Sequence, residues 1–375
     1  MEQYLGKVCT PTVGIGDFVR TGDVIAVDGD KGVPPVHSSV SGKVVDIAEH
    51  PHPYGHRAKC IFIESDGNDT WSSQKLEGPV AEVIHQSGII ETYGLLKTIK
   101  SQRADTVLLN GTDHSPYVFV DRVIMMEEKK SVVKGLQLLM EAVGAKKGVV
   151  GINASDIDVI DAISAEVAGH GIHVVPLKMV YTRGMGRLLS RDVSRKLKAD
   201  LNRVMVSTVP CVRAVYQAVA EGKPFVETYV SVHGAARTDA IKVRIGTSFK
   251  EVIEAVGGYT GTPKRIVMNS PMTGVAQYTD EVPVIRSTHS LIVQYDASVE
   301  EPGPCIRCAS CVDVCPVNLL PNMLALYSKK NKFEECRKYH VSACIECGYC
   351  SYSCPSKIPI MQLIRYAKAN LESGG

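Results

Sequence analysis

Two closely spaced cysteine motifs near the end of the chain restrict its chemistry more than any other feature. Nine of the 12 cysteines lie between Cys305 and Cys354, and eight of these nine form two copies of the motif C-x2-C-x2-C-x3-C-P. The first copy contains Cys305, Cys308, Cys311 and Cys315, and the second contains Cys344, Cys347, Cys350 and Cys354. Disulfide frameworks normally staple small secreted domains. A dense block on a chain of 375 residues indicates metal ligation in a reducing compartment instead.

The spacing of these cysteines fits iron–sulfur cubanes. Three thiolates at x2 intervals let a tight loop cover one face of a cubane, and the proline after the fourth cysteine turns the chain toward the other cluster. We therefore expect two [4Fe–4S] clusters that exchange their fourth ligands. The first is expected at Cys305, Cys308, Cys311 and Cys354, and the second at Cys344, Cys347, Cys350 and Cys315. Two structural zinc sites are the alternative, but zinc prefers paired C-x2-C knuckles with a longer loop between the pairs.

The rest of the chain divides into segments that differ in their pattern of apolar and turn-forming residues. Short β-like runs with Gly-Asp turns in residues 1–75 predict an all-β unit. In residues 76–222, apolar runs such as ADTVLLNG and KKGVVGIN alternate with helical patterns that end at Gly144 and Gly222, which predicts βαβ units around a parallel sheet. Strand-like runs around the helical segment KEVIEAVGG suggest a β-grasp unit in 223–297. The expected fold class is thus multidomain, α/β plus β.

Charge and hydropathy exclude some classes of partner. The chain has 42 basic and 40 acidic side chains, a net charge of +2, which gives no reason to expect nucleic acid as a partner. No apolar run approaches the roughly 20 residues that span a bilayer, so we expect no direct membrane insertion. The first residues show no basic segment followed by an apolar one, and we expect a cytoplasmic protein.

The order of these segments resembles that of the RnfC-like family, which includes the peripheral subunits of ferredoxin:NAD⁺ oxidoreductases and electron-transfer proteins associated with proline reductase and cobalamin reductase. The likeness is carried by VHSSVSGKV, EHPHPYG, LLNGTDHSPY, GTSFKEVIEAVGG, NSPMTG and both cysteine motifs. It implies four domains: a barrel-sandwich hybrid (1–75), a complex I flavoprotein-like α/β domain (76–222), a soluble-ligand-binding β-grasp (SLBB) domain (223–297) and a dicluster ferredoxin domain (298–375).

Three motifs that bind FMN and NADH in this family are altered in the present chain. The family's glycine-rich loop reads IETYGLLKTIK, where Glu91, Thr92 and Tyr93 precede a single glycine, Gly94; a backbone that approaches a cofactor closely needs glycine. The acidic segment reads Asn110–Tyr117 with one carboxylate, Asp113, and the asparagine pair is replaced by Met205–Val209. We therefore expect FMN to be absent and NADH not to be bound. We interpret Arg183–Gly186 (RGMG) as a surface turn.

Three further groups of residues could be interpreted as functional sites, but we favour structural roles for them. His50, His52 and His56 are spaced like metal ligands, but the intervening prolines favour extended backbone, so we expect surface histidines in a turn. Asp113 and His114 are adjacent, and neighbours on a strand end point to opposite faces. Cys336 fits neither motif and is expected to be a helix-packing or free thiol.

The expected function is electron transfer within a larger oxidoreductase complex of anaerobic metabolism. Electrons would come from a flavoprotein or ferredoxin partner and leave to a catalytic subunit, with the β-grasp domain as a docking surface. Two alternatives remain open: an FMN-containing NADH dehydrogenase subunit with a divergent flavin site, and a non-redox adaptor whose clusters are structural.

Overall fold

The computed structural model describes residues 1–3, 8–29, 33–73, 76–89, 104–178, 180–198, 200–298 and 300–373. The chain forms two compact units. The first unit comprises Met1–Asn269 and Val275–Tyr295, and the second comprises Ser270–Gly274 and Asp296–Gly375. The short segment Ser270–Gly274 thus leaves the middle of the chain to join the C-terminal unit.

The first unit begins with two small antiparallel sheets, each of three strands, in the orders β1-β3-β4 and β2-β5-β6. Their strands are β1 (Thr10–Pro11), β2 (Phe18–Val19), β3 (Val24–Val27), β4 (Val36–His37), β5 (Gly42–Pro51) and β6 (Arg57–Ser65). Val19, Ile25, Val36 and Val44 form the small core between the sheets. The sequence prediction of an all-β unit is confirmed here.

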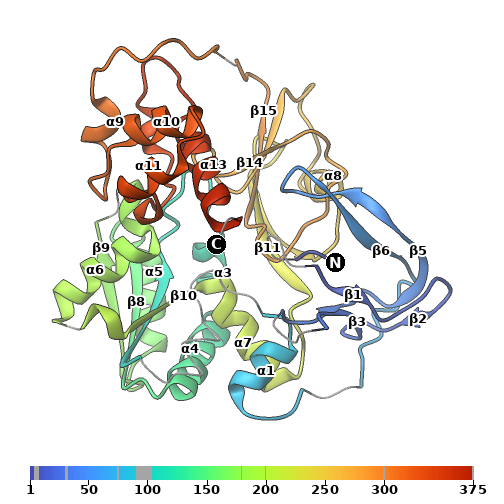
Figure 1. Cartoon of the computed structure of the whole chain (residues 1–375). Coiled ribbons are helices and arrows are strands. Elements are labelled where there is room, and N and C mark those ends of the chain that lie inside the picture. Colours follow the sequence, from blue (N-terminus) through green and yellow to red (C-terminus); the bar gives the residue numbers. More distant parts are fainter. Residues whose placement is uncertain are drawn as a thin grey trace. The chain divides into compact units, whose positions relative to one another are not determined.

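A four-stranded parallel sheet of order β10-β7-β8-β9 follows. Figure 1 labels β8, β9 and β10 of this sheet. Its strands are β7 (Thr106–Gly111), β8 (Lys147–Asn153), β9 (Ile172–Leu177) and β10 (Val204–Thr208). Its helices are α1 (Val80–Gln86), α3 (Val120–Glu127), α4 (Lys129–Val143), α5 (Ile157–Glu166), α6 (Gly186–Leu197) and α7 (Val209–Glu221), with 3₁₀ turns η1 (Tyr181–Gly184) and η2 (Leu201–Arg203).

Both faces of this sheet are covered because side chains alternate along each strand. In β7, Val107 and Leu109 join the core formed with α3, α4, α5 and α7. Leu108, between them, faces the other way and packs against Leu189 and Val193 of α6. The helices α4 and α7 end as predicted, at Gly144 and Gly222, each with a left-handed backbone (φ 71° and 67°).

The third part of the first unit is a mixed five-stranded sheet of order β12-β11-β15-β13-β14. Its strands are β11 (Glu227–His233), β12 (Asp239–Arg244), β13 (Arg265–Met268), β14 (Val275–Gln277) and β15 (Ser290–Gln294), with helix α8 (Phe249–Ala255). Ser248 caps α8 and forms a capping box with Glu251. Phe249 and Ile253 of the helix are buried in the core of this sheet.

The second unit is built from short helices around a core that contains cysteines. The helices are α9 (Ser310–Asp313), α10 (Pro321–Lys329), α11 (Phe333–Lys338), η3 (Val341–Ala343), α12 (Tyr349–Tyr352) and α13 (Ile360–Ser373). Leu324 of α10, Cys336 of α11 and Ile364 of α13 are fully or almost fully buried in this core. Cys336 is therefore a helix-packing thiol, as expected, and its Sγ lies 3.6 Å from the carbonyl oxygen of Leu324.

None of the helices in the described part of the chain combines the length and the hydropathy needed to cross a membrane.

Candidate iron–sulfur site

The two cysteine motifs fold into loops of the same backbone conformation. In the first loop, Arg307 and Ala309 have positive φ angles of 57° and 61°, and α9 begins at the next residue. In the second loop, Glu346 and Gly348 occupy the equivalent positions with φ angles of 54° and 76°, and α12 follows. Gly348 is required there, since a Cβ atom would overlap the carbonyl oxygen of Met272. These left-handed residues curl each loop so that its cysteines face one space.

The loops enclose two cavities, each lined by four cysteines. The first has a volume of about 370 Å³ and is lined by Cys305, Cys308, Cys311 and Cys354. The second is smaller and is lined by Cys315, Cys344, Cys347 and Cys350. Each cavity thus combines the three closely spaced cysteines of one motif with the fourth cysteine of the other. That these sulfur atoms hold iron stays a prediction.

Burial and hydrogen bonding of the thiols suit ligation to a cationic centre. Burial raises the pKa of Cys350 to about 12, and it also raises the pKa of Cys344 and Cys347. A buried thiolate is therefore unstable without a metal ion, which supplies the missing positive charge. Backbone N–H groups already point at two of the sulfurs: Leu319 donates to Cys315 Sγ at 3.3 Å and Glu346 donates to Cys344 Sγ at 3.4 Å. The donor set and its surroundings fit an iron–sulfur cluster.

The altered acidic segment of the α/β part has acquired structural roles. The carboxylate of Asp113 accepts hydrogen bonds from the backbone N–H groups of Asp121 (3.0 Å) and Arg122 (2.8 Å). It therefore caps the first turn of α3, which lacks a side-chain cap of its own. Burial raises the pKa of Asp113 and also that of Asp121. The carboxylate of Asp113 thus faces α3, whereas Nδ1 of His114 lies 3.5 Å from the hydroxyl oxygen of Thr112.

The prediction of a surface turn at Arg183–Gly186 is wrong, because Gly184 and Gly186 are buried. Asn110 Nδ2, at the carboxyl end of β7, donates to the carbonyl oxygen of Gly184 at 3.0 Å. His114 packs so closely on Gly184 that a Cβ atom there would overlap it. The chain's own η1 segment therefore covers the end of β7. The glycine-poor loop at Glu91–Gly94 lies outside the described residues.

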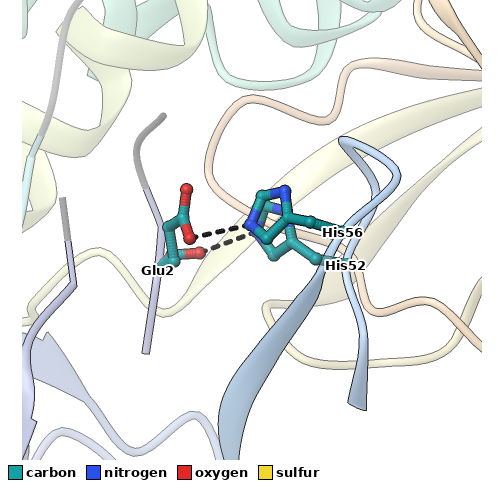
Figure 2. Close-up of side chains that lie close together, drawn as sticks. All are labelled: Glu2, His52 and His56. Carbon is teal, nitrogen blue, oxygen red and sulfur yellow. Dashed lines mark hydrogen bonds and ion pairs between the residues drawn. The ribbon is translucent and has the colours of Figure 1, made fainter. Parts of the chain in front are cut away.

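The expectation of surface histidines is wrong for His52, which is 2% exposed (Figure 2). Its Nε2 lies 3.0 Å from the carbonyl oxygen of Glu2, and the Nε2 of His56 lies 2.9 Å from the Glu2 carboxylate. The two imidazoles stack with centroids 4.5 Å apart. Sequence reasoning missed this group because Glu2 is about 50 residues away along the chain.

These three side chains resemble a metal-ligand set, but the hydrogen bonds favour a structural latch. The backbone N–H of Tyr54 points at Nδ1 of His52 (3.4 Å), so the ring proton belongs on Nε2, where it is donated to Glu2. Coordination of a metal through Nε2 would require the opposite tautomer, with the proton on Nδ1, which faces the Tyr54 N–H. Burial lowers the pKa of His52, which keeps the ring neutral. The group fastens the first residues of the chain to the β5–β6 hairpin.

The fold and the paired cysteine loops define a multidomain protein of the iron–sulfur electron-transfer class. Three family models match: the RnfC barrel sandwich hybrid domain over residues 1–68, the Nuo51 FMN-binding domain over 84–220 and the 4Fe-4S dicluster domain over 297–355.

Curated relatives match along nearly the whole chain. The C subunit of the ion-translocating oxidoreductase complex of Methanosarcina acetivorans is 36% identical over 99% of this chain and 91% of its own length. The C subunit of the Na⁺-translocating ferredoxin:NAD⁺ oxidoreductase complex of Acetobacterium woodii is 33% identical over 99% and 90%. The chain belongs to this family, the RnfC family. Among solved structures, an NAD⁺-reducing [NiFe]-hydrogenase in the H₂-reduced state shares the fold, with a TM-score of 0.53 and 14% identity, over 78% of this chain and 62% of that one.

Proposed function

We propose that this chain is an electron-transfer subunit that carries two [4Fe–4S] clusters, the first held by Cys305, Cys308, Cys311 and Cys354 and the second by Cys315, Cys344, Cys347 and Cys350. The observation that carries the proposal is the exchange of fourth cysteines between the two cavities.

When bound, the clusters supply one-electron chemistry, and the chain positions them and sets their surroundings. The exchanged cysteines hold the two sites next to each other. Helix α9, which carries Cys311 of the first set, is in contact with helix α12, which carries Cys350 of the second. An electron that arrives at one site therefore has a short path to the other.

The partners are proposed from the family. The curated relatives are subunits of ion-translocating complexes, and we place this chain in a complex of that kind, at the cytoplasmic side. A flavoprotein or ferredoxin partner would supply electrons, and another subunit would accept them. The four-domain division at residues 75, 222 and 297 remains our proposal. Its third domain, of the SLBB type, is supported by the mixed sheet with a single helix, and we assign it a docking role.

We further propose that the α/β part binds neither FMN nor NADH. Open parallel sheets bind nucleotides at the carboxyl ends of their strands, and at the end of β7 the polar groups of Asn110 and Asp113 are already engaged within the chain. The alternative function, an FMN-dependent NADH dehydrogenase subunit, is favoured by the match to the Nuo51 FMN-binding domain.

One set of measurements separates these functions. We expect anaerobically purified protein to contain about eight iron and eight sulfide per chain and no stoichiometric flavin. Dithionite should reduce both clusters, and NADH alone should not. Stoichiometric FMN together with NADH-driven cluster reduction would establish the alternative, and an iron-free zinc protein would refute both functions.

A further inference from the structure

A charged group of three side chains lies beside the second cysteine loop. Glu346 belongs to the loop itself, between Cys344 and Cys347, and Arg365 and Lys368 project from helix α13. Residues three apart on a helix share one face, so both cations reach the same carboxylate. Arg365 Nε lies 2.9 Å from Glu346 Oε2, and Lys368 Nζ lies 2.7 Å from Glu346 Oε1.

These contacts extend to the backbone of the ligand loop. Lys368 Nζ also donates to the carbonyl oxygen of Cys344 at 2.7 Å. The N–H of Glu346 donates to Cys344 Sγ at 3.4 Å, so one residue joins the sulfur to the two cations. The side chain of Lys368 is only 18% exposed. Its charge is therefore screened less by water than a surface charge would be.

The charges do not cancel. Two cations face one carboxylate, which leaves one excess positive charge next to a cysteine that is expected to bind the second cluster. At the first cavity the described cationic lining residues are Arg307 and Lys329, and both are exposed. Lys357, three residues after Cys354, pairs with Glu300 and is also largely exposed. A partly buried excess charge thus distinguishes the second site among the described residues.

Reduction adds an electron, and burial in an apolar core opposes the added negative charge. Nearby positive charge and N–H···S hydrogen bonds oppose that effect, because both stabilise the reduced state. We propose that the Arg365–Glu346–Lys368 group raises the reduction potential of the cluster bound by Cys315, Cys344, Cys347 and Cys350. The inference rests on the ligand assignment proposed above.

The decisive variant is Lys368→Met, which removes the charge and keeps much of the side-chain volume. We expect the equilibrium constant for reduction of one cluster to fall about tenfold. For a one-electron couple, this lowers the midpoint potential of that cluster by about 59 mV. The other midpoint should stay in place. Redox titrations followed by electron paramagnetic resonance and visible absorbance measure both midpoints, and neither readout depends on turnover.

Two further variants and a control make the outcome unambiguous. Lys368→Arg keeps the charge and should leave both midpoints unchanged, whereas Glu346→Gln removes the opposing anion and should raise one of them. Lys357→Met is the matched control, an exposed lysine near the other cysteine set, and should shift neither. Equal midpoints in the parent and in Lys368→Met, with iron retained, would overturn the proposal.

If Lys368→Met loses iron, Glu346→Gln decides the matter, and the absence of a positive shift in that variant overturns the proposal. The iron and sulfide content of the parent protein tests the ligand assignment separately. A parent with two clusters but no shift in the variants would therefore refute this inference and leave the proposed function intact.

Discussion

Arg213 offers the sharpest test of how the first unit is held together. It lies in α7 and is 1% exposed, yet it is charged and pairs with Glu128 and Glu227, each at 2.7 Å. Glu128 precedes α4 and Glu227 begins β11, so this one guanidinium connects the parallel sheet's helices with the mixed sheet. Replacement by methionine would leave two carboxylates, each 17% exposed, without their principal partner.

The magnitude follows from the structure. Burial opposes ionisation of Glu128, but hydrogen bonds from Arg213 and Lys242 outweigh it and lower its pKa from 4.5 to about 2. That shift corresponds to about 3 kcal/mol of stabilisation. Loss of one partner of a buried ion pair typically costs about 3–5 kcal/mol. Lys242 remains 2.9 Å from Glu128 in the variant, so we expect the lower end, about 3 kcal/mol.

The loss of stability can be measured by urea denaturation followed by the fluorescence of Trp71, the chain's single tryptophan. Trp71 and Arg213 both belong to the first unit. A group whose pKa is lowered by folding stabilises the fold fully above its unfolded pKa. Its contribution disappears as the pH falls toward the folded value. The difference between the parent and Arg213→Met should therefore be complete at pH 6 and shrink between about pH 4.5 and pH 2.

The matched control is Arg122→Met, because Arg122 pairs with Asp158 at the surface, where both side chains are at least 40% exposed. We expect that variant to lose less than about 1 kcal/mol. Equal losses in the two variants, or a loss at Arg213 that does not depend on pH, would refute the reasoning.

Two smaller changes test the site and the N-terminal latch. In Gly348→Ala, the added Cβ would overlap Met272 O at a backbone φ of 76°, so we expect iron content to fall to about half; Gly144→Ala, at φ 71° but in open space, should cost about 1 kcal/mol and keep all iron. Retention of full iron in Gly348→Ala would contradict the close packing. In His52→Ala, the buried contact with Glu2 is lost, and thermal denaturation should show a loss of about 1–3 kcal/mol. Added Zn²⁺ should not raise the melting temperature of the parent protein, and a saturable rise that His52→Ala abolishes would show that the latch is a metal site.

Local patterns in the sequence predicted the elements whose signals are themselves local. The apolar runs at β7 and β8 and the terminal glycines Gly144 and Gly222 indicated the parallel sheet and two of its helices, α4 and α7. Helix α6 was not anticipated, because charged residues such as Arg191, Asp192 and Arg195 interrupt its sequence and its buried apolar stripe consists of Leu188, Leu189 and Val193. A helix with such a stripe becomes stable only when the stripe packs against the neighbouring sheet.

The same distinction applies to the functional residues. The spacing of the cysteines predicts the backbone conformation of their loops, because residues with left-handed backbone, such as Arg307 and Glu346, occupy the same position in both motifs. By contrast, the contacts of Gly184 with Asn110 and of His52 with Glu2 join residues about 74 and 50 positions apart. No local pattern marks such pairs, and both were therefore assigned to surface turns from sequence.

The exchange of fourth cysteines is the central claim, and iron counting in two double variants tests it most directly. In Cys305→Ala/Cys354→Ala both losses fall on the first cluster, so we predict about four iron atoms per chain. In Cys344→Ala/Cys354→Ala each cluster loses one ligand, and we predict iron near zero. If each motif instead held its own cluster, the second variant would keep about four iron atoms and the first would lose nearly all, and that result would contradict the account.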